Sequence, residues 1–154
     1  MIQVTIPGRE PLQIEHLILD VDGTIALEGT LLPGVVERLH TLQDYVEVHL
    51  LTTDHYGTQA SIDTQLGLTA TVIQHGGTEK GGYALQLGAD NVAALGNGLN
   101  DIPLFNTVAL RIAVLGPEGL APGLISASDV LVRDVNEGLD LLLSPDRVVA
   151  TLQR

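Results

Sequence analysis

Two carboxylates lie two positions apart in the stretch from His16 to Thr24, which reads His-Leu-Ile-Leu-Asp-Val-Asp-Gly-Thr. Asp20 and Asp22 repel each other unless a cation, a shared proton or strong hydrogen-bond donors offset their charges. A divalent metal is the simplest remedy, and Mg²⁺ prefers oxygen ligands of this kind. The pair therefore predicts a metal site, although an acidic turn of purely conformational origin explains the same residues about equally well.

The residues before this pair indicate how it is positioned. Leu17, Ile18 and Leu19 form an apolar run without polar alternation, which is typical of a strand buried on both faces of a parallel sheet. Gly23 lets the chain turn after the strand. Both acids are therefore expected at the carboxyl end of a central strand, where ligands bind in open α/β sheets.

Hydroxyl and ammonium groups occur further along the chain. Thr52 and Thr53 follow a predicted strand, so their hydroxyls either face the same sheet edge or form an ordinary surface turn. Lys80 is the only lysine. It lies 17 positions before Asn97, which is in the glycine-rich stretch that follows the predicted strand at 92–95. An exposed lysine is usually a solvated surface residue, but these two features favour a role in a site. The five histidines, at positions 16, 40, 49, 55 and 75, show no shared metal-ligand spacing.

Short apolar strands alternate with helical segments along the chain. Strands are predicted at 17–19, 46–51, 71–74, 92–95, 109–115 and 130–132, and helices at 33–43, 57–66, 78–87, 139–143 and 147–152, with a helical turn at 102–106. This alternation predicts an α/β fold with a doubly wound parallel sheet. Residues 1–14 predict an edge β-ribbon with a turn at Pro7-Gly8, and residues 25–33 predict a flap over the strand ends.

Composition limits the classes of function. The 154 residues fit one domain, and 45% hydrophobic with 3% aromatic residues predicts an aliphatic core. A net charge of −12 argues against a nucleic-acid partner. The absence of cysteine excludes disulfides and thiolate chemistry. Since no apolar run reaches the length of a membrane span and the start lacks a signal-peptide pattern, we expect a cytoplasmic protein without a membrane partner.

Asp-Val-Asp-Gly-Thr, at 20–24, resembles the first motif of the haloacid dehalogenase (HAD) superfamily, Asp-x-Asp-Gly-Thr, and three later stretches resemble its other motifs in order. The resemblance implies a HAD-like Rossmannoid fold and a Mg²⁺-dependent phosphohydrolase. Asp20 would attack phosphorus to give an aspartyl phosphate and would also bind Mg²⁺. Asp22 would protonate the leaving group, later activate water and bind the metal through its backbone carbonyl, a role that a raised pKa would suit.

The second and third motifs would supply phosphate contacts. Thr52 resembles the hydroxyl that bonds a phosphate oxygen, with Thr53 beside it as a second candidate. Lys80 resembles the cation that steadies the phosphoryl group and the charge of Asp20. By the same resemblance, Gly23 and Asn100 are expected next to the bound phosphate of the substrate.

The fourth motif departs from the family pattern. Gly-Asn-Gly-Leu-Asn-Asp, at 96–101, resembles Gly-Asp-Gly-x-Asn-Asp. Asn97 replaces the acid that commonly ligates Mg²⁺; its amide oxygen can still bind the ion, but with one negative charge fewer the affinity should fall. Asp101 remains as a supporting or substitute metal ligand.

The HAD proteins that this chain resembles most are the soluble P-type ATPase-like group, through Leu-Thr-Thr-Asp at 51–54 and Gly-Asn-Gly-Leu-Asn-Asp-Ile-Pro at 96–103. Family members usually take their specificity from an inserted cap. Only 27 residues separate Thr24 from Thr52 and another 27 separate Thr52 from Lys80, so no cap is expected. An open site would then suit a large phosphorylated substrate, or a homo-oligomer in which a neighbouring subunit supplies the lid.

Two alternatives to hydrolysis stay open at this point. The substitution at Asn97 and the lack of a cap also fit a non-catalytic module that binds Mg²⁺ or phosphate. A phosphotransfer domain of the P-type ATPase kind is the other alternative. Asp22 favours hydrolysis, because domains that must keep their aspartyl phosphate tend to lack an acid/base residue at this place.

Overall fold

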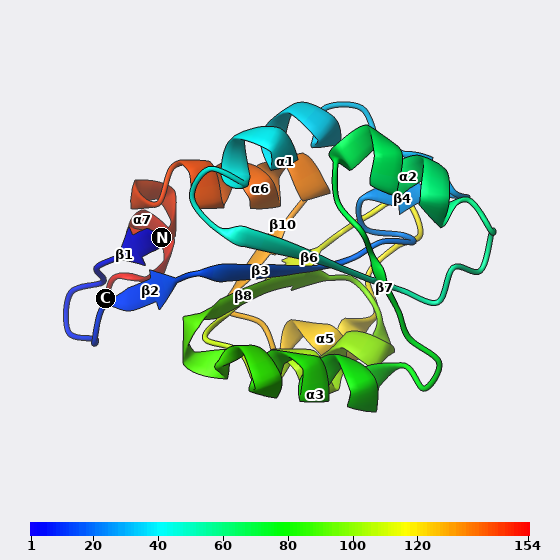
Figure 1. Cartoon of the computed structure of the whole chain (residues 1–154). Coiled ribbons are helices and arrows are strands. Elements are labelled where there is room, and N and C mark those ends of the chain that lie inside the picture. Colours follow the sequence, from blue (N-terminus) through cyan, green and yellow to red (C-terminus); the bar gives the residue numbers. More distant parts are fainter.

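The computed structural model describes all 154 residues and contains a sheet of six parallel strands in the order β10-β9-β8-β3-β6-β7 (Figure 1). The strands are β3 (His16–Asp20), β6 (Glu47–Thr52), β7 (Thr71–Val72), β8 (Val92–Gly96), β9 (Leu110–Val114) and β10 (Val130–Val132). The chain runs from β3 to one side through β6 and β7, and then to the other side through β8, β9 and β10. This confirms the predicted doubly wound sheet and makes the carboxyl end of β3 the switch point, where ligand crevices open.

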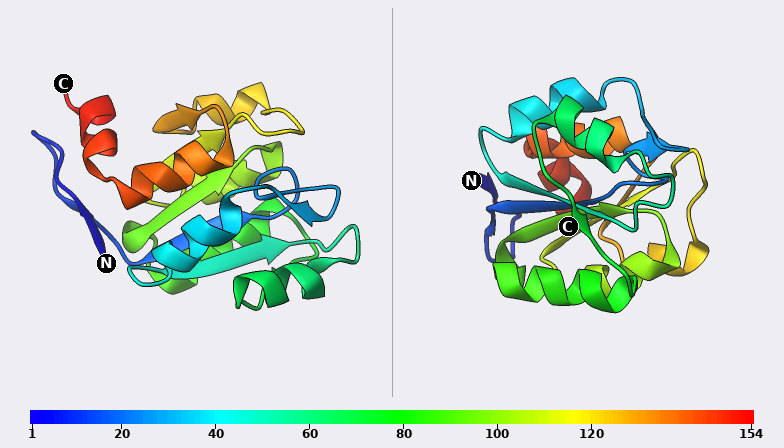
Figure 2. Two further views of the ribbon diagram at one scale, coloured as in Figure 1. Left: turned by 90° about the horizontal axis from the view of Figure 1, so that it is seen from above. Right: turned by 45° about the vertical axis from the view of Figure 1, so that its right-hand side comes forward.

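Helices cover both faces of the sheet, with α1, α2 and α6 on one face and α3 and α5 on the other (Figures 1 and 2). The helices are α1 (Val35–Leu42), α2 (Gln59–Leu66), α3 (Gly77–Leu87), α4 (Ile102–Phe105), α5 (Pro122–Ile125), α6 (Val135–Leu143) and α7 (Asp146–Leu152), with short 3₁₀ turns η1 (Ala89–Asn91) and η2 (Leu99–Asp101). No helix combines the length and the apolar character that a membrane span requires.

The apolar run of β3 faces a core on each side of the sheet. Leu17 and Leu19 belong to the larger apolar cluster, together with residues of α1 and α6. Ile18 belongs to a second cluster on the opposite face, which includes Ala84 of α3 and Phe105 of α4. Because both faces are covered, the strand has no polar alternation, as its sequence indicates.

The amino-terminal ribbon is a hairpin of β1 (Ile2–Val4) and β2 (Leu12–Ile14). The hairpin was predicted correctly, but its placement at the sheet edge was wrong, because it forms a two-stranded sheet of its own and leads straight into β3. In Figure 2 it lies beside α7. Ile2, Val4 and Ile14 are buried in the larger core cluster, which holds the ribbon against the body of the molecule.

No cap domain is inserted between the strands. Between Thr24 and β6 the chain forms only a small antiparallel hairpin, β4 (Ala26–Leu27) and β5 (Thr30–Leu31), followed by α1. The hairpin lies within the predicted flap, 25–33, and starts directly after the paired acids. Its turn is fixed to the loop after β6, because the Thr58 hydroxyl donates a hydrogen bond to the Gly29 carbonyl at 3.0 Å.

Several elements differ from the sequence-based prediction. β7 is only Thr71–Val72, shorter than the predicted 71–74. α6 begins at Val135 rather than 139, because the carboxylate of Asp134 accepts a hydrogen bond from the Glu137 amide at 2.9 Å and caps the helix. The short helix α5, which starts with Pro122, was not predicted.

Candidate active site

Lys80 lies at the centre of the polar cluster at the carboxyl end of β3. Its Nζ atom donates hydrogen bonds to Asp20 Oδ1 at 3.0 Å and to Asp101 Oδ1 at 2.8 Å, and Asn100 Oδ1 lies at 3.5 Å. The side chain is only 1% exposed. Burial by itself would lower the pKa of Lys80, but the two carboxylates outweigh it and raise that pKa above its usual value. Lys80 is therefore a permanently charged, fully paired cation.

The glycine-rich start of α3 brings Lys80 to this position. A side chain at Gly77 would place its Cβ atom 2.7 Å from the Asn100 carbonyl oxygen, and one at Gly81 would lie 3.2 Å from the Pro103 carbonyl oxygen. The glycines weaken the helix locally. In return, they let α3 approach the loop after β8 and α4 closely enough for Lys80 to reach both acids.

Asp101 is fully buried, and both of its carboxylate oxygens are already engaged. Oδ1 accepts from Lys80, and Oδ2 accepts from the backbone amides of Asn97 and Gly98, each at 3.1 Å. A methyl group on Gly96 would collide with this carboxylate. These contacts make Asp101 the residue that shapes the loop after β8 and positions Lys80. Its ligation of a metal stays a prediction that these contacts do not favour.

Asp20 is the carboxylate whose environment is most perturbed. Burial and the negative charge of Asp101 raise its pKa to about 7, Lys80 opposes this shift, and Asp22 adds to it. Only Oδ1 is hydrogen-bonded to Lys80, whereas Oδ2 accepts no hydrogen bond, and the side chain as a whole is 14% exposed. One oxygen of Asp20 is thus held in place and the other is free to react or to bind a cation.

Asp22 lies next to the loop that follows β6. Burial raises the pKa of its carboxyl group above the usual value; His55 opposes the shift, and Asp54 reinforces it. A carboxyl group with a raised pKa is suited to donate a proton near neutral pH. His55 is therefore near enough to act on Asp22 electrostatically.

Asn97 is held by hydrogen bonds on both sides of its amide. Its Oδ1 atom accepts from the Thr24 hydroxyl at 3.3 Å, and its Nδ2 atom donates to the Gly119 carbonyl at 3.2 Å. These contacts tie the first and fourth motifs together. The amide oxygen keeps a second lone pair that can bind a cation.

Glu118 is an acidic residue near the site that the motifs did not identify. A methyl group on Gly23 would collide with the Glu118 carboxylate and lie 3.0 Å from Asn97 Nδ2, so Glu118 and Asn97 flank the same point. Gly23 has a φ of 78°, which also favours glycine. The turn that contains Glu118 follows the carboxyl end of β9 and could have been suspected on that ground, but it matches no motif.

The two threonines after β6 differ in burial. Thr52 is buried, and its hydroxyl oxygen accepts a hydrogen bond from the Asp54 amide at 2.9 Å. Asp54 adopts a positive φ of 53°, which shapes this turn. Thr53 is exposed. The hydroxyl hydrogen of Thr52 stays available to a phosphate oxygen, which favours Thr52 over Thr53 as the phosphate contact.

The sequence and the fold were each compared with those of known proteins. No protein-family model matches the chain. The uncharacterized protein MJ0073 of Methanocaldococcus jannaschii is 45% identical over 60 residues, which are 39% of this chain and 64% of that protein. Copper-transporting ATPase 1 of Rattus norvegicus is 31% identical over 135 residues, 86% of this chain but 9% of the transporter. The chain thus spans less than two thirds of the length of either relative.

Solved structures match almost the whole chain. A protein from Streptomyces avermitilis whose name places it among HAD family hydrolases has a TM-score of 0.70 at 20% identity, over 92% of this chain and 91% of that one. The 3-deoxy-D-manno-octulosonate 8-phosphate phosphatase of Moraxella catarrhalis, solved with a magnesium ion, a phosphate ion and KDO, has a TM-score of 0.70 at 22% identity, over 91% and 94%. At these identities the likeness is one of fold.

Proposed function

We propose that this chain, which has the fold of the haloacid dehalogenase superfamily, is a metal-dependent phosphohydrolase that acts through Asp20. The observation that carries the proposal is the buried Lys80 ammonium, which holds one oxygen of Asp20 and leaves the other free at the switch point of the sheet. Buried charge of this kind is costly to maintain and is typical of functional sites.

In the first half of the reaction, Asp20 Oδ2 attacks the phosphorus atom of a phosphomonoester. A bond forms between Oδ2 and phosphorus while the bond from phosphorus to the alcohol oxygen breaks. Asp22 gives its proton to that oxygen, so the alcohol leaves neutral. Lys80, already held by Asp101, stabilises the negative charge that gathers near Asp20.

In the second half, water attacks the phosphorus atom of the aspartyl phosphate. Asp22, now ionised, takes a proton from that water, the bond from phosphorus to Oδ2 breaks, and inorganic phosphate and free Asp20 result. We assign phosphate contacts to the Thr52 hydroxyl and to Asn100, whose side chain approaches Lys80. Gly23 and Thr53 are candidate neighbours of the phosphate.

The residues fit a divalent cation such as Mg²⁺. Burial and neighbouring acids disfavour the ionised form of Asp20 despite its contact with Lys80. A bound cation would stabilise that ionised form. Oxygen ligands would come from the Asp20 carboxylate, the Asp22 backbone carbonyl and the Asn97 amide, with the Glu118 carboxylate close to Asn97. When bound, the ion would supply charge neutralisation for the phosphoryl group. The magnesium and phosphate ions of the Moraxella catarrhalis structure support this choice.

A phosphotransfer domain is the second candidate, and the similarity to a copper-transporting ATPase over 86% of the chain favours it. Such a domain would form the same aspartyl phosphate but hydrolyse it slowly. Asp22 distinguishes the two functions, because its raised pKa equips it for the proton transfers of hydrolysis.

Hydrolysis of p-nitrophenyl phosphate, measured with Mg²⁺ and with EDTA, tests the proposal. We expect metal-dependent turnover that falls by about a thousandfold or more in Asp20→Asn, since removing a nucleophile costs at least this much. Asp44→Asn is the matched control, because Asp44 is an exposed acid outside the site, and it should keep the wild-type rate. Equal rates in wild type and Asp20→Asn would contradict the proposal.

A further inference from the structure

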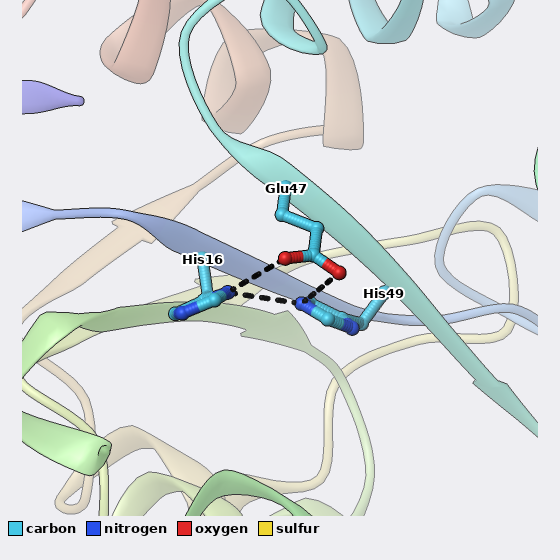
Figure 3. A group of neighbouring side chains, drawn as sticks. All are labelled: His16, Glu47 and His49. Carbon is cyan, nitrogen blue, oxygen red and sulfur yellow. Dashed lines mark hydrogen bonds and ion pairs between the residues drawn. The ribbon is translucent and has the colours of Figure 1, made fainter. Parts of the chain in front are cut away.

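A second cluster of metal-binding side chains lies at the opposite end of the same two strands. His16 is the first residue of β3 and pairs in register with Glu47, the first residue of β6. His49 lies two residues further along β6, on the same side as Glu47. Figure 3 shows the three side chains pointing toward one another. The histidines show no metal-ligand spacing along the sequence, because only the parallel pairing of β3 with β6 brings His16 and His49 together.

The ligand atoms of the cluster are spaced as a metal site requires. His16 Nδ1 and His49 Nε2 lie 3.1 Å apart (Figure 3). Glu47 Oε2 lies 3.6 Å from His16 Nδ1, and Glu47 Oε1 lies 3.8 Å from His49 Nε2. Ligands at 2.0 to 2.1 Å from a tetrahedral Zn²⁺ ion are about 3.3 Å apart, so only small side-chain rotations separate this arrangement from a coordinated one.

Hydrogen bonds within the cluster do not pair all three of its side chains. Both distances from Glu47 exceed those of hydrogen bonds, although its two oxygens face the two ring nitrogens. The nitrogens themselves can share only one proton between two neutral rings. The Glu47 carboxylate therefore faces the space between His16 Nδ1 and His49 Nε2. A cation in that space could be bound by the carboxylate and by the lone pairs of both nitrogens.

Tyr83 of α3 orients the His49 ring. Its hydroxyl lies 2.8 Å from His49 Nδ1, so a proton on Nδ1 donated to Tyr83 leaves the Nε2 lone pair directed at His16 and Glu47. This contact from outside the cluster fixes the ring so that its second nitrogen faces the other two side chains.

We propose that His16, Glu47 and His49 bind a first-row transition-metal ion of the Zn²⁺ class, separately from the site at Asp20. Two imidazoles and one carboxylate leave a fourth tetrahedral position, which water would fill. That position is open, because the Glu47 side chain is 69% exposed. His16 precedes Asp20 by four residues on β3, about 13 Å along an extended strand, so the two sites are distinct. The ion would tie β3 to β6.

Calorimetric titration of Zn²⁺ into the full chain, in excess Mg²⁺ and in an Asp20→Asn background, tests the proposal. The Asp20→Asn substitution and the excess Mg²⁺ prevent Zn²⁺ binding at the Asp20 site from contributing to the titration. We expect one bound Zn²⁺ ion per chain, with affinity lowered at least about tenfold by Glu47→Gln or His16→Gln. His40→Gln is the matched control because His40 is an exposed histidine on α1, and it should bind as tightly as the background protein.

A second readout protects the test against a variant that folds poorly. Glu47→Gln keeps the shape of an exposed side chain, and its melting temperature without metal should match that of the background protein. Zn²⁺ should then raise the melting temperature of the background and His40→Gln proteins but not of Glu47→Gln. The absence of Zn²⁺ binding in the background protein, or binding that Glu47→Gln and His16→Gln leave unchanged, would overturn the proposal.

Discussion

β3 carries a polar cluster at each end, and the two clusters are built in opposite ways. At the carboxyl end, Lys80 is 1% exposed and fixed between two carboxylates, Asp20 at the end of β3 and Asp101 in η2. At the amino end, Glu47 is 69% exposed, and its partners come only from β3 and β6. The first cluster depends on the balance of buried charges, whereas the second depends on strand register. Loss of one member should therefore damage the fold at the first and only ligand binding at the second.

The largest effect is expected when the buried cation is removed. Lys80→Met leaves Asp20 and Asp101 without their shared partner, and breaking a buried ion pair costs about 3 to 5 kcal/mol. The free energy of unfolding, measured by urea denaturation, should fall by this amount. Arg133→Gln is the control, since Arg133 pairs with Glu137 on the surface and its loss should change the free energy of unfolding far less. Similar losses of unfolding free energy in the two variants would show that the buried charges of this cluster do not determine its stability.

A smaller effect is expected at Gly23, where backbone conformation and close packing both require glycine. Gly23→Ala forces alanine to a positive φ, which costs about 1 to 2 kcal/mol, and drives a methyl group into Glu118 and Asn97. Phosphatase turnover should fall at least about tenfold, because small displacements of catalytic groups are costly. Gly57→Ala shares the positive φ but has no neighbour within 4 Å, so it should lose stability without losing turnover. Equal turnover in both variants would remove Gly23 from the site.

The smallest effect concerns the pH dependence of stability without metal. The folded-state pKa of Asp20 is raised to about 7 from 3.8, so the folded protein binds more protons than the unfolded chain between these values. The stabilising contribution of Asp20 to the free energy of unfolding is thus present below pH 4 and is lost as the pH rises to 7. In EDTA, Asp20→Asn should gain stability relative to wild type as the pH rises from 4 to 8. A constant difference in urea-unfolding free energy across this range would contradict the raised pKa.

Much of the carboxyl-end cluster could be predicted from sequence because local pattern determines it. An apolar run that ends in Asp20 and Asp22 indicates a buried strand and its ligand-binding end. The alternation of strands and helices predicts which loops lie at the same edge of the sheet. The single lysine lies beside Asp20, as the sequence predicts, while its role in a reaction stays a prediction. The strands β3, β8 and β10 lie within a residue or two of the predicted ranges.

Other features depend on contacts between residues that are distant in sequence. Asp101 could not be recognised as the partner that positions Lys80, because its hydrogen bonds require the turn after β8 and the approach of α3. Glu118 reaches Gly23 only through the packing of the turn after β9. His16 and His49 become neighbours only in the register of β3 and β6. Each case needs a tertiary contact that no single stretch of sequence specifies.

A covalent phosphate on Asp20 is the central feature of the proposed reaction. Protein mixed briefly with acetyl phosphate and Mg²⁺ can be quenched and reduced with borohydride, which converts an acyl phosphate to an alcohol. We expect peptide mass spectrometry to find homoserine at position 20 and unmodified aspartate at position 22, with no conversion in EDTA. Reduction at another residue, or no reduction at Asp20 while phosphate is being released, would contradict the assignment of Asp20 as the nucleophile.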